Sequence, residues 1–485
     1  MHLKPGAHPT GLASGAAQPT TWRERFALAL YSAALFLAQP LFRRKLQQRS
    51  HQEPAYAQDV EQRFGHYRAA EAALAPGTWV WIHAVSLGET HAAAALLQPL
   101  RQALPGMRLL LTHGTATGRE AGRSLLQPGD AQVWQPWDTP GATHRFVQHF
   151  RPRIGLLVET EVWPNLVRAC KRSGVPICLV NARLSAKSLR QSQRLAWLSV
   201  PTYRALSAVW AQTHDDAQRL RRLGATVDAV LGNLKFDITP NLRQCAQGQA
   251  QRLALGKPVL LFASSRETEE QMLIDALRLR RTIAVGTTEA TGAQITNALR
   301  SAQWLVVPRH PQRFGGVAAL FEAAGFSVSR RSVDGSGFAP ADIWLGDTVG
   351  EMALYLGLAD VALLGGSFAP LGGQNLIEVA ACGCPVVMGP HTFNFAQAAE
   401  MAQAEGAALT VQDMAQAVDG ALRLAFDPVA LKQASSAAVA FALRHQGAGR
   451  RTCERLLVLL AEGGLEPGRT LSLGVLLGQQ GVDRL

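Results

Sequence analysis

Long apolar runs are scarce in this chain of 485 residues, although 47% of its residues are hydrophobic. A many-pass membrane protein needs about 20 nearly uninterrupted apolar residues for each spanning helix, and only one stretch approaches that length. Cysteine is also sparse, because the six cysteines are scattered and form no C-x-x-C pair. These absences exclude a many-pass membrane protein and a disulfide-rich scaffold, and they predict free thiols in a reducing compartment.

Several signatures of enzyme sites are missing as well. The chain has no D-x-D, no G-x-S-x-G, no G-x-G-x-x-G and no Walker loop. The histidines of the first half, His83, His91 and His113, lack the tight spacing of metal ligands. The sequence therefore predicts no metal site and no serine-hydrolase nucleophile elbow.

Basic residues are concentrated at the N-terminus. The net charge is +12, and residues 1–50 hold seven of the 48 basic residues against one acid, so this tenth of the chain carries +6. An uncharged run, residues 26–42 (FALALYSAALFLAQPLF), lies within it and is followed at once by Arg43-Arg44-Lys45. An apolar run with a cationic flank is typical of a segment that contacts a membrane.

The apolar run has several interpretations. A cleaved signal peptide is disfavoured by the long polar leader before it. A full span is marginal, since 17 residues of helix reach only about 25 Å and Gln39-Pro40 interrupts the end. We expect a membrane-seated helix whose cations bind anionic lipids of the cytoplasmic leaflet, each contributing about 1 kcal/mol. A buried N-terminal helix of the globular body is the simpler alternative. A nucleic-acid-binding protein is disfavoured, because the basic excess lies beside an apolar run instead of an aromatic-interleaved groove.

Short apolar runs alternate with helical patterns from about Trp79 onward. Strands are expected in two series, first over residues 79–85, 108–112, 154–158 and 176–180, then over 258–263, 304–307, 342–345, 361–364 and 385–388. Residues 231–240 (LGNLKFDITP) separate the series as a linker, and the polar residues 280–301 are typical of an insertion. The alternation predicts an α/β protein with two doubly wound parallel sheets facing one another across a cleft, with functional residues in the loops after the strands.

In the first series, two loops after strands carry acids. Glu89 follows the strand over residues 79–85 and begins a helix expected over residues 89–100, where the helix dipole would stabilise an ionised general base. Plain helix capping is the commoner explanation for an acid there. Glu159 and Glu161 follow the strand over residues 154–158, and on an extended segment they would face the same way. They could orient a substrate, bind a metal or pair with Arg168.

In the second series, glycines follow the strand over residues 361–364 and precede a helix expected over residues 374–382. Glycine allows backbone amides to approach an anion, and a helix that opens behind such a loop favours phosphate. Glu378 lies in the first turn or so of that helix, within reach of ribose hydroxyls. Arg309, after the strand over residues 304–307, can bind phosphate bidentately. An ordinary βα turn and a solvated basic loop are the alternatives.

Six separated motifs occur in one order along the chain: residues 81–89 (WIHAVSLGE), 159–165 (ETEVWPN), 181–185 (NARLS), 232–237 (GNLKFD), 308–314 (PRHPQRF) and 389–395 (GPHTFNF). Together they resemble the 3-deoxy-D-manno-octulosonic acid (Kdo) transferases of lipopolysaccharide synthesis. The resemblance covers about residues 25–446, with Gln374 and Arg266 where the family usually has histidine.

The resemblance implies a GT-B glycosyltransferase with two Rossmann-like domains. It implies transfer of Kdo from CMP-Kdo to a lipid A precursor (lipid IVA) at the cytoplasmic face of the inner membrane, with inversion and without a metal or other cofactor. Glu89 resembles the catalytic base, and Glu159 resembles a second acid on the acceptor side. The cytidylate site is implied to comprise Arg309, Gly372, Gly373, Asn375 and Glu378.

The domain division follows from these patterns together. We expect a basic segment with a membrane-associated helix over residues 1–50, an acceptor domain over 51–235, a donor domain over 236–446, and a C-terminal helix and tail over 447–485. The expected partners are CMP-Kdo, the lipid A precursor and anionic inner-membrane lipids, with no nucleic acid. Another GT-B enzyme that uses a UDP-sugar and a membrane lipid acceptor is the alternative function.

Overall fold

The computed structural model describes residues 21–51, 53–68, 77–237, 240–286, 298–335 and 337–462. The chain divides into two compact units, unit 1 with Met1–Leu231 and Thr452–Leu485, and unit 2 with Gly232–Arg451. Most of the polar leader, the middle of the insertion expected over residues 280–301, two residues of the expected linker and the tail after residue 462 lie outside the described residues.

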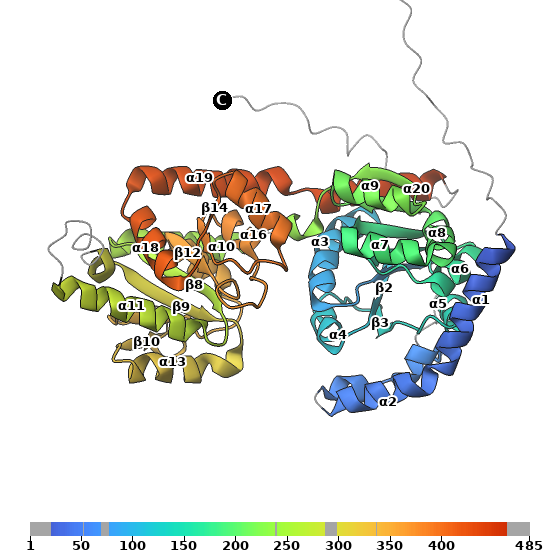
Figure 1. Cartoon of the computed structure of the whole chain (residues 1–485), viewed down its shortest axis with the longest axis horizontal. Coiled ribbons are helices and arrows are strands. Elements are labelled where there is room, and N and C mark those ends of the chain that lie inside the picture. Colours follow the sequence, from blue (N-terminus) through green and yellow to red (C-terminus); the bar gives the residue numbers. More distant parts are fainter. Residues whose placement is uncertain are drawn as a thin grey trace, which may run out of the picture. The chain divides into compact units, whose positions relative to one another are not determined.

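Unit 1 is built on a parallel sheet with helices packed around it (Figure 1). Its strands are β1 (Trp79–His83), β2 (Arg108–His113), β3 (Ala131–Trp134), β4 (Ile154–Val158), β5 (Ile177–Ala182), β6 (Ala208–Ala211) and β7 (Val227–Val230). Its helices are α1 (Trp22–Leu37), α2 (Gln39–Ser50), η1 (Pro54–Ala57), η2 (Val60–Phe64), α3 (Leu87–Ala103), α4 (Ala116–Arg123), α5 (Pro140–Phe150), α6 (Pro164–Arg172), α7 (Ala186–Arg194), α8 (Ala196–Arg204) and α9 (His214–Arg222).

Unit 2 repeats this design. Its strands are β8 (Val259–Ser265), β9 (Gln303–Pro308), β10 (Val328–Arg330), β11 (Ile343–Leu345), β12 (Val361–Leu364), β13 (Val386–Met388) and β14 (Ala408–Thr410). Its helices are η4 (Leu234–Asp237), α10 (Leu242–Leu255), α11 (Glu269–Gly286), η5 (Pro311–Arg313), α13 (Phe314–Ala323), α14 (Arg331–Asp334), α15 (Met352–Leu358), α16 (Leu376–Ala381), α17 (Ala396–Ala404), α18 (Met414–Ala425) and α19 (Pro428–His445), and α20 (Ala448–Glu462) continues into unit 1.

The strand order places a switch point in each sheet. The orders are β3-β2-β1-β4-β5-β6-β7 in unit 1 and β10-β11-β9-β8-β12-β13-β14 in unit 2, with every pair parallel. In unit 1 the chain first adds β2 and β3 on one side of β1. It then returns to β4 on the other side of β1 and continues outward through β5, β6 and β7. In unit 2 the same reversal occurs between β8 and β12. Open parallel sheets bind ligands at the carboxyl ends of the strands at such a point.

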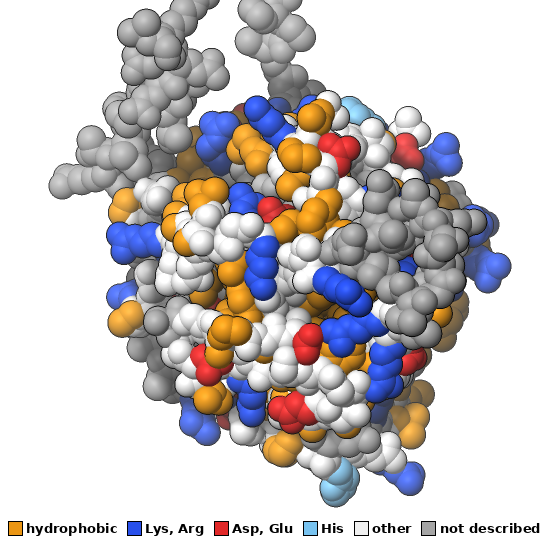
Figure 2. Space-filling view, turned by 90° about the vertical axis from the view of Figure 1, so that its left-hand side faces the viewer, with side chains coloured by type: hydrophobic (Ala, Val, Ile, Leu, Met, Phe, Trp, Pro, Cys, Tyr) orange, Lys and Arg blue, Asp and Glu red, His pale blue; other side chains and the backbone are white. Residues whose placement is uncertain are grey.

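Each sheet is buried on both faces. Along β8, Val259, Leu261 and Ala263 belong to one apolar cluster, and the alternate residues Leu260 and Phe262 belong to another. Strands covered on both faces are continuous apolar runs, and this explains why the central strands were recognisable in the sequence. On the face of unit 2 that Figure 2 shows, basic, acidic and apolar side chains are intermixed, as is usual for a surface that meets solvent.

The N-terminal apolar run is divided between α1 and α2, which are bent by 49° around Ala38. The predicted interruption at Gln39-Pro40 is confirmed, because Pro40 lies in the first turn of α2. Among the described helices, no single one has the length and apolarity to cross a membrane, and α1 with α2 meets that test only as a bent pair.

Helix α1 is fixed to unit 1 along one side only. The Ser32 hydroxyl donates to Oδ1 of Asn165 at 3.0 Å, and Tyr31 hydrogen-bonds the buried carboxyl of Asp138. No residue of α1 is fully buried. The expected alternative of a helix buried inside the globular body is therefore wrong, because the opposite side of α1 remains exposed.

Candidate active site

The two acids predicted in the first half lie beside the switch point of unit 1. Glu89 is the third residue of α3, which follows β1, and Glu159 directly follows β4. Strands β1 and β4 pair directly, so the two loops are neighbours at one edge of the sheet. The predicted helix over residues 89–100 starts two residues earlier, at Leu87, because Ser86 caps it.

The Glu89 carboxyl is held by the loop that precedes its own helix. Its Oε2 accepts a hydrogen bond from the Val85 amide at 2.7 Å, and its Oε1 accepts one from the Ser86 hydroxyl at 3.1 Å. The side chain returns to the start of the helix much as in a capping box. The capping explanation is therefore correct in geometry, yet the carboxyl is also positioned by two donors.

The pKa of the Glu89 carboxyl is raised to about 7, first by burial and then by the nearby charges of Glu161 and Glu159. The expectation that the helix dipole keeps this acid ionised is wrong in its net effect. Desolvation outweighs the dipole and the two hydrogen bonds, because only 9% of the residue is exposed. A carboxyl with a pKa near neutrality is well matched to accept a proton from a hydroxyl group.

A neighbouring loop fixes the backbone that holds Glu89. The Val85 carbonyl accepts hydrogen bonds from the amides of Gly114 and Thr115, at 3.2 and 3.0 Å, and from the Thr115 hydroxyl at 2.9 Å. Three donors from the β2–α4 loop thus converge on the residue whose own amide donates to the Glu89 carboxyl. The position of the carboxyl therefore depends on packing between two loops at the sheet edge.

Glu159 begins a turn directly after β4, so the segment that carries Glu159 and Glu161 is not extended as predicted. Both acids are nevertheless close enough to Glu89 to raise the pKa of its carboxyl. Glu159 has a left-handed backbone with φ of 65°, an uncommon conformation for a residue other than glycine. Its carboxylate lies 3.8 Å from the Arg183 guanidinium, and not beside Arg168 as one prediction had it. Glu161 accepts a hydrogen bond from the Trp163 indole at 3.0 Å, and burial raises its pKa.

The histidines that end β1 and β2, His83 and His113, are structural groups. Burial lowers the pKa of His83 to about 3 and that of His113 to about 4. His83 Nδ1 lies 2.8 Å from the Thr112 hydroxyl, and His113 Nδ1 lies 2.8 Å from the Ala84 carbonyl. Within the described ranges, no three side chains of His, Cys, Asp or Glu are arranged to hold a metal ion.

In unit 2, Arg309 and Glu378 are brought into electrostatic reach of each other. Arg309 follows β9 with an exposed side chain, and its amide donates to the Ser265 carbonyl at the end of β8. Burial raises the pKa of the Glu378 carboxyl, and the charge of Arg309 opposes this shift. An anion-binding guanidinium and a partly buried carboxyl therefore share the carboxyl edge of this sheet.

Helix α16 begins at Leu376, two residues later than the helix predicted over residues 374–382. Asn375 is its N-cap, and the Asn375 Oδ1 accepts from the Ile377 amide at 3.1 Å. Gly372 has φ of +91°, and a Cβ at this position would lie 2.3 Å from Nδ2 of Asn394. Gly373 has φ of +76° and donates to the Gly366 carbonyl at 2.7 Å. Both glycines are thus required by the backbone itself.

The start of this loop, from Gly366 to Ala369, binds a carboxylate of the chain itself. The fully buried carboxylate of Glu269 accepts hydrogen bonds from the amides of Gly366, Phe368 and Ala369 at 2.7, 3.0 and 3.2 Å. The Arg266 amide donates to it as well, at 2.9 Å. The prediction that the amides of this loop are available to an external anion is therefore wrong for Gly366, Phe368 and Ala369.

Arg313, in the motif over residues 308–314, is a structural arginine. It donates to both carboxylate oxygens of buried Glu270, at 2.9 and 2.8 Å, and so anchors η5 to α11. Arg266, Arg309 and Arg313 all lower the pKa of His310, after burial as the first cause. This corner of the sheet edge is therefore rich in positive charge.

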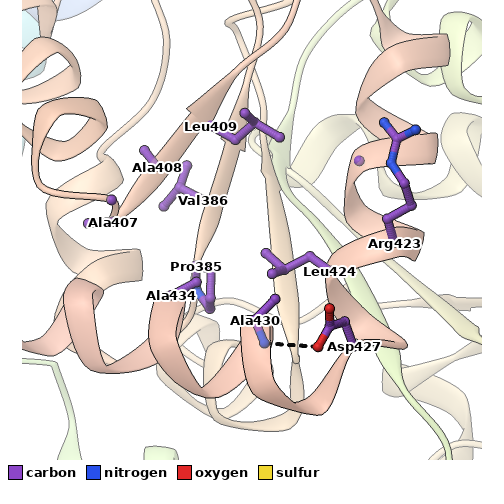
Figure 3. A pocket seen from close by; sticks show the side chains of 12 residues that line it. Pro385, Val386, Ala407, Ala408, Leu409, Arg423, Leu424, Asp427, Ala430 and Ala434 are labelled. Atoms are coloured by element: carbon purple, nitrogen blue, oxygen red, sulfur yellow. Dashed lines mark hydrogen bonds between the residues drawn. The ribbon is translucent and has the colours of Figure 1, made fainter.

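A cavity of about 410 Å³ lies elsewhere in unit 2 (Figure 3). It is lined mainly by small apolar residues around the start of β13 and β14, with Arg423 and Asp427 from α18 and the turn after it. It therefore lies at the amino edge of the sheet, opposite the loops that carry Arg309 and Glu378. Parallel sheets place ligand sites at the other edge, so this cavity is separate from the candidate site.

Sequence reasoning missed Glu269 and the role of Arg183. Glu269 is 97 residues from Gly366, so no local pattern joins them. Arg183 lies in the motif over residues 181–185, but its contact with Glu159 crosses from β5 to β4. No local sequence pattern marks Glu159 either, because its left-handed backbone is a property of the folded chain.

Comparisons with known proteins agree on one family. A model of the family described as 3-deoxy-D-manno-octulosonic-acid transferase (kdotransferase) matches residues 58–238. The chain is 47% identical over 401 residues to the 3-deoxy-D-manno-octulosonic acid transferase of Bordetella pertussis, covering 81% of this chain and 90% of that one.

Two solved structures were also similar. The C-terminal CMP-Kdo binding domain of WaaA from Acinetobacter baumannii is 31% identical and covers 41% of this chain and 96% of its own, with a TM-score of 0.36. UDP-GlcNAc 2-epimerase from Neisseria meningitidis is 14% identical, with a TM-score of 0.50 over 78% of this chain and all of its own. The second match concerns the fold alone, and it agrees with two parallel α/β domains of the GT-B kind.

Proposed function

Because the chain belongs to the family of 3-deoxy-D-manno-octulosonic acid (Kdo) transferases, we propose that it moves Kdo from CMP-Kdo to a lipid A precursor at the cytoplasmic face of the inner membrane. The donor is suggested by the WaaA domain named for binding CMP-Kdo, which is 31% identical to this chain over 41% of its length. The acceptor, the mechanism and the location are proposals that rest on the features described below.

Glu89 is the proposed general base. Its carboxylate takes the proton of an acceptor hydroxyl while the hydroxyl oxygen forms a bond to the anomeric carbon of Kdo. The bond from that carbon to the phosphate oxygen of CMP breaks on the opposite side, so CMP leaves and the anomeric centre inverts. The observation that carries this proposal is the buried Glu89 carboxyl at the switch point, with a pKa of about 7.

Glu159 is proposed to orient the acceptor. It follows β4, which pairs with the strand β1 that precedes the helix of Glu89. Its backbone is strained at φ of 65°, and Arg183 balances its charge at 3.8 Å. Strained residues occur often at functional sites, since other parts of the fold must maintain them. A fixed carboxylate beside the base can accept a hydrogen bond from a second sugar hydroxyl, and so direct the reacting one toward Glu89.

The proposed donor site lies at the carboxyl edge of the unit 2 sheet. The Arg309 guanidinium would bind the phosphate of CMP and stabilise its charge as it leaves. Gly372 and Gly373 allow the backbone to approach the nucleotide, and Asn375 holds the start of α16. Glu378 would accept hydrogen bonds from the ribose hydroxyls, and the charge of Arg309 opposes the rise in pKa that burial causes in this carboxyl.

Membrane attachment is proposed to use α1 and α2. Six large apolar residues of these helices are 63 to 76% exposed to solvent: Trp22, Phe26, Leu30, Phe36, Leu37 and Leu41. Arg44 and Lys45 on α2 are exposed near them. An apolar helix face with cations beside it fits a helix lying in the interface of an anionic membrane.

The first experiment is a transfer assay with CMP-Kdo and a tetra-acylated lipid A precursor in detergent, followed by mass spectrometry. Added mass in units of Kdo is expected from the wild type, and a rate at least about 100-fold lower from Glu89→Gln. Glu120→Gln, on the exposed surface of α4, is the matched control and should retain full rate. Transfer by Glu89→Gln at the wild-type rate would contradict the role of Glu89.

CMP binding separates the remaining explanations. Titration with CMP and with UDP should show tighter binding of CMP, and Arg309→Gln should weaken CMP binding. A preference for UDP would favour the alternative of a UDP-sugar transferase. Intact CMP binding without transfer would mean that the donor is correct and the acceptor is wrong.

A further inference from the structure

A row of cations on α7 leads away from the candidate active site. Lys187, Arg190 and Arg194 are spaced by three and four residues, so at about 100° per residue they share one face of the helix. All three side chains are exposed, whereas Leu189 on the opposite side is buried. Arg183, two residues before the Ser185 cap, extends the row toward β5. We call these four residues the α7 cation row.

One end of the row touches the acidic pair of the site. Arg183 lies 3.8 Å from the carboxylate of Glu159, and half of its side chain remains exposed. Glu159 in turn is close enough to Glu89 to raise its pKa. The row therefore begins where the acceptor hydroxyl would be activated.

The other end of the row reaches an exposed apolar surface. Leu195 and Trp197 directly follow α7 and are 63 and 62% exposed. The Arg23 guanidinium of α1 lies 5.9 Å from the Trp197 ring and 5.6 Å from the Trp22 ring. The apolar residues after α7 are thus continuous with the exposed side of α1.

Among the described residues, no acid pairs with the three cations of the row that lie on α7. Over the ranges that the structure describes, Lys187, Arg190 and Arg194 form no ion pair. The nearest acids of α9 are already engaged, since Asp215 pairs with Arg219 and Asp216 accepts from the Leu184 amide. Three exposed cations beside one another repel, and a bound polyanion removes that repulsion.

We propose that the α7 cation row binds a phosphate group of the glycosyl acceptor. Along this surface the carboxylates come first, the cations next and the apolar side chains last. A phosphorylated glycolipid has the matching order: its reacting hydroxyl would meet the carboxylates, its phosphate the cations, and its lipid chains the apolar side chains. Arginine binds phosphate oxygens bidentately, and the three cations on α7, which form no ion pair among the described residues, carry enough charge to neutralise a dianion. This inference rests on the proposed function, because it assumes a lipid-linked sugar acceptor.

The test compares two acceptors that differ only in phosphate. Kinetics are measured in neutral detergent with a synthetic acyl-glucosamine acceptor that carries a phosphate monoester and with its dephosphorylated analogue. For Lys187→Gln/Arg190→Gln, the KM for the phosphorylated acceptor should rise about ten-fold or more, while kcat stays within about two-fold. The KM for the dephosphorylated acceptor should not change. Arg222→Gln, an exposed cation on α9, is the matched control and should match the wild type.

Other outcomes overturn the inference. Equal changes in KM for both acceptors would mean that the row does not recognise phosphate. Unchanged kinetics with weaker binding only to anionic phosphatidylglycerol vesicles would assign the row to the membrane surface instead. If the wild type transfers nothing to either acceptor, the proposed function fails, and direct binding of the two acceptors by fluorescence titration still decides the inference. Tighter binding of the phosphorylated one, lost in the double variant, would support it.

Discussion

The behaviour of Glu89 follows from the conflict between its burial and its hydrogen bonds. Burial favours the neutral carboxyl, while the Val85 amide and the Ser86 hydroxyl favour the ionised one. The outcome is a group that changes charge near pH 7. A general base must be ionised to accept a proton, so activity should be lost as the pH falls below this value.

We predict that kcat/KM rises with pH and reaches a plateau above about pH 7, in an assay of transfer between pH 5.5 and 8.5. In Ser86→Ala this rise should move to higher pH, because the lost hydroxyl no longer stabilises the carboxylate. Thr213→Ala removes an equivalent helix cap from α9 without touching Glu89, and its profile should be that of the wild type. A profile that does not respond to Ser86→Ala would contradict Glu89 as the titrating group.

Glu269 shows how a buried carboxylate can organise a glycine loop. Four backbone amides from two segments donate to it, and none of the residue is exposed. We predict that Glu269→Gln lowers the free energy of unfolding by about 2–4 kcal/mol. The NH₂ group of glutamine is a hydrogen-bond donor, and it would face backbone amides that are donors too. Chemical denaturation measures this. CMP binding should weaken as well, since the loop leads to Gly372.

Glu267→Gln is the control for that substitution. Glu267 is exposed and its contacts are with Arg266 and Arg313 at the surface, so unfolding should change by less than about 1 kcal/mol. Equal effects of the two substitutions would show that Glu269 has no special part in holding the loop.

At the scale of single elements, the segment predicted as a linker contributes a helix cap. Asp237, at the end of η4, accepts hydrogen bonds from the amides of Gly447, Ala448 and Gly449 at the start of α20. The partners are 210 to 212 residues away in sequence. The segment is thus a fixed part of unit 2 where the chain enters it and leaves it.

We predict that Asp237→Ala lowers the free energy of unfolding by about 1–3 kcal/mol, because it leaves the first amides of α20 without their acceptor. Asp427→Ala removes an ordinary exposed cap from α19, where the side chain accepts from Val429 and Ala430, and should cost about 0.5–2 kcal/mol. Urea denaturation compares the two. A smaller loss for Asp237→Ala than for Asp427→Ala would contradict the bracing role of η4.

Most central strands could be predicted from the sequence, and the four edge strands could not. Strands such as β1, β4, β8 and β12 are buried on both faces and therefore form apolar runs. The strands β3, β7, β10 and β14 were missed, and they are short and partly exposed, as the three-residue β14 with no fully buried position shows. The four-residue β6 was also missed, although it is buried. An edge strand lacks the continuous apolar pattern because one side meets solvent.

The placement of site residues was predictable for a related reason. Loops after central strands were known to meet at one sheet edge, so Glu89, Glu159, Arg309 and Glu378 could be assigned to the right edges. Their surroundings could not be predicted, because burial sets the pKa of Glu89 and a remote carboxylate, Glu269, occupies the first glycine amides. Such effects depend on contacts between distant segments, which local patterns do not contain.

At the scale of the whole molecule, two properties favour the proposed binding to an anionic membrane. The chain carries a net charge of +12, half of it within residues 1–50, and α1 exposes one apolar side. Electrostatic attraction acts over the Debye length, which falls from about 10 Å at 0.1 M salt to about 3 Å at 1 M. Burial of apolar side chains is not weakened in this way. Salt can therefore separate the two contributions to membrane binding.

We predict that binding to phosphatidylcholine vesicles with about 30% phosphatidylglycerol falls more than about ten-fold between 0.1 and 1 M NaCl, because several cations each contribute about 1 kcal/mol at low salt. The residual binding at high salt should be lost in Phe26→Ser/Leu30→Ser, which removes two exposed apolar side chains of α1. Vesicle sedimentation measures both, and Leu253→Ser, an exposed apolar residue of α10, is the control. Binding that is insensitive to salt and to the α1 substitutions would mean that this end of the chain does not contact the membrane.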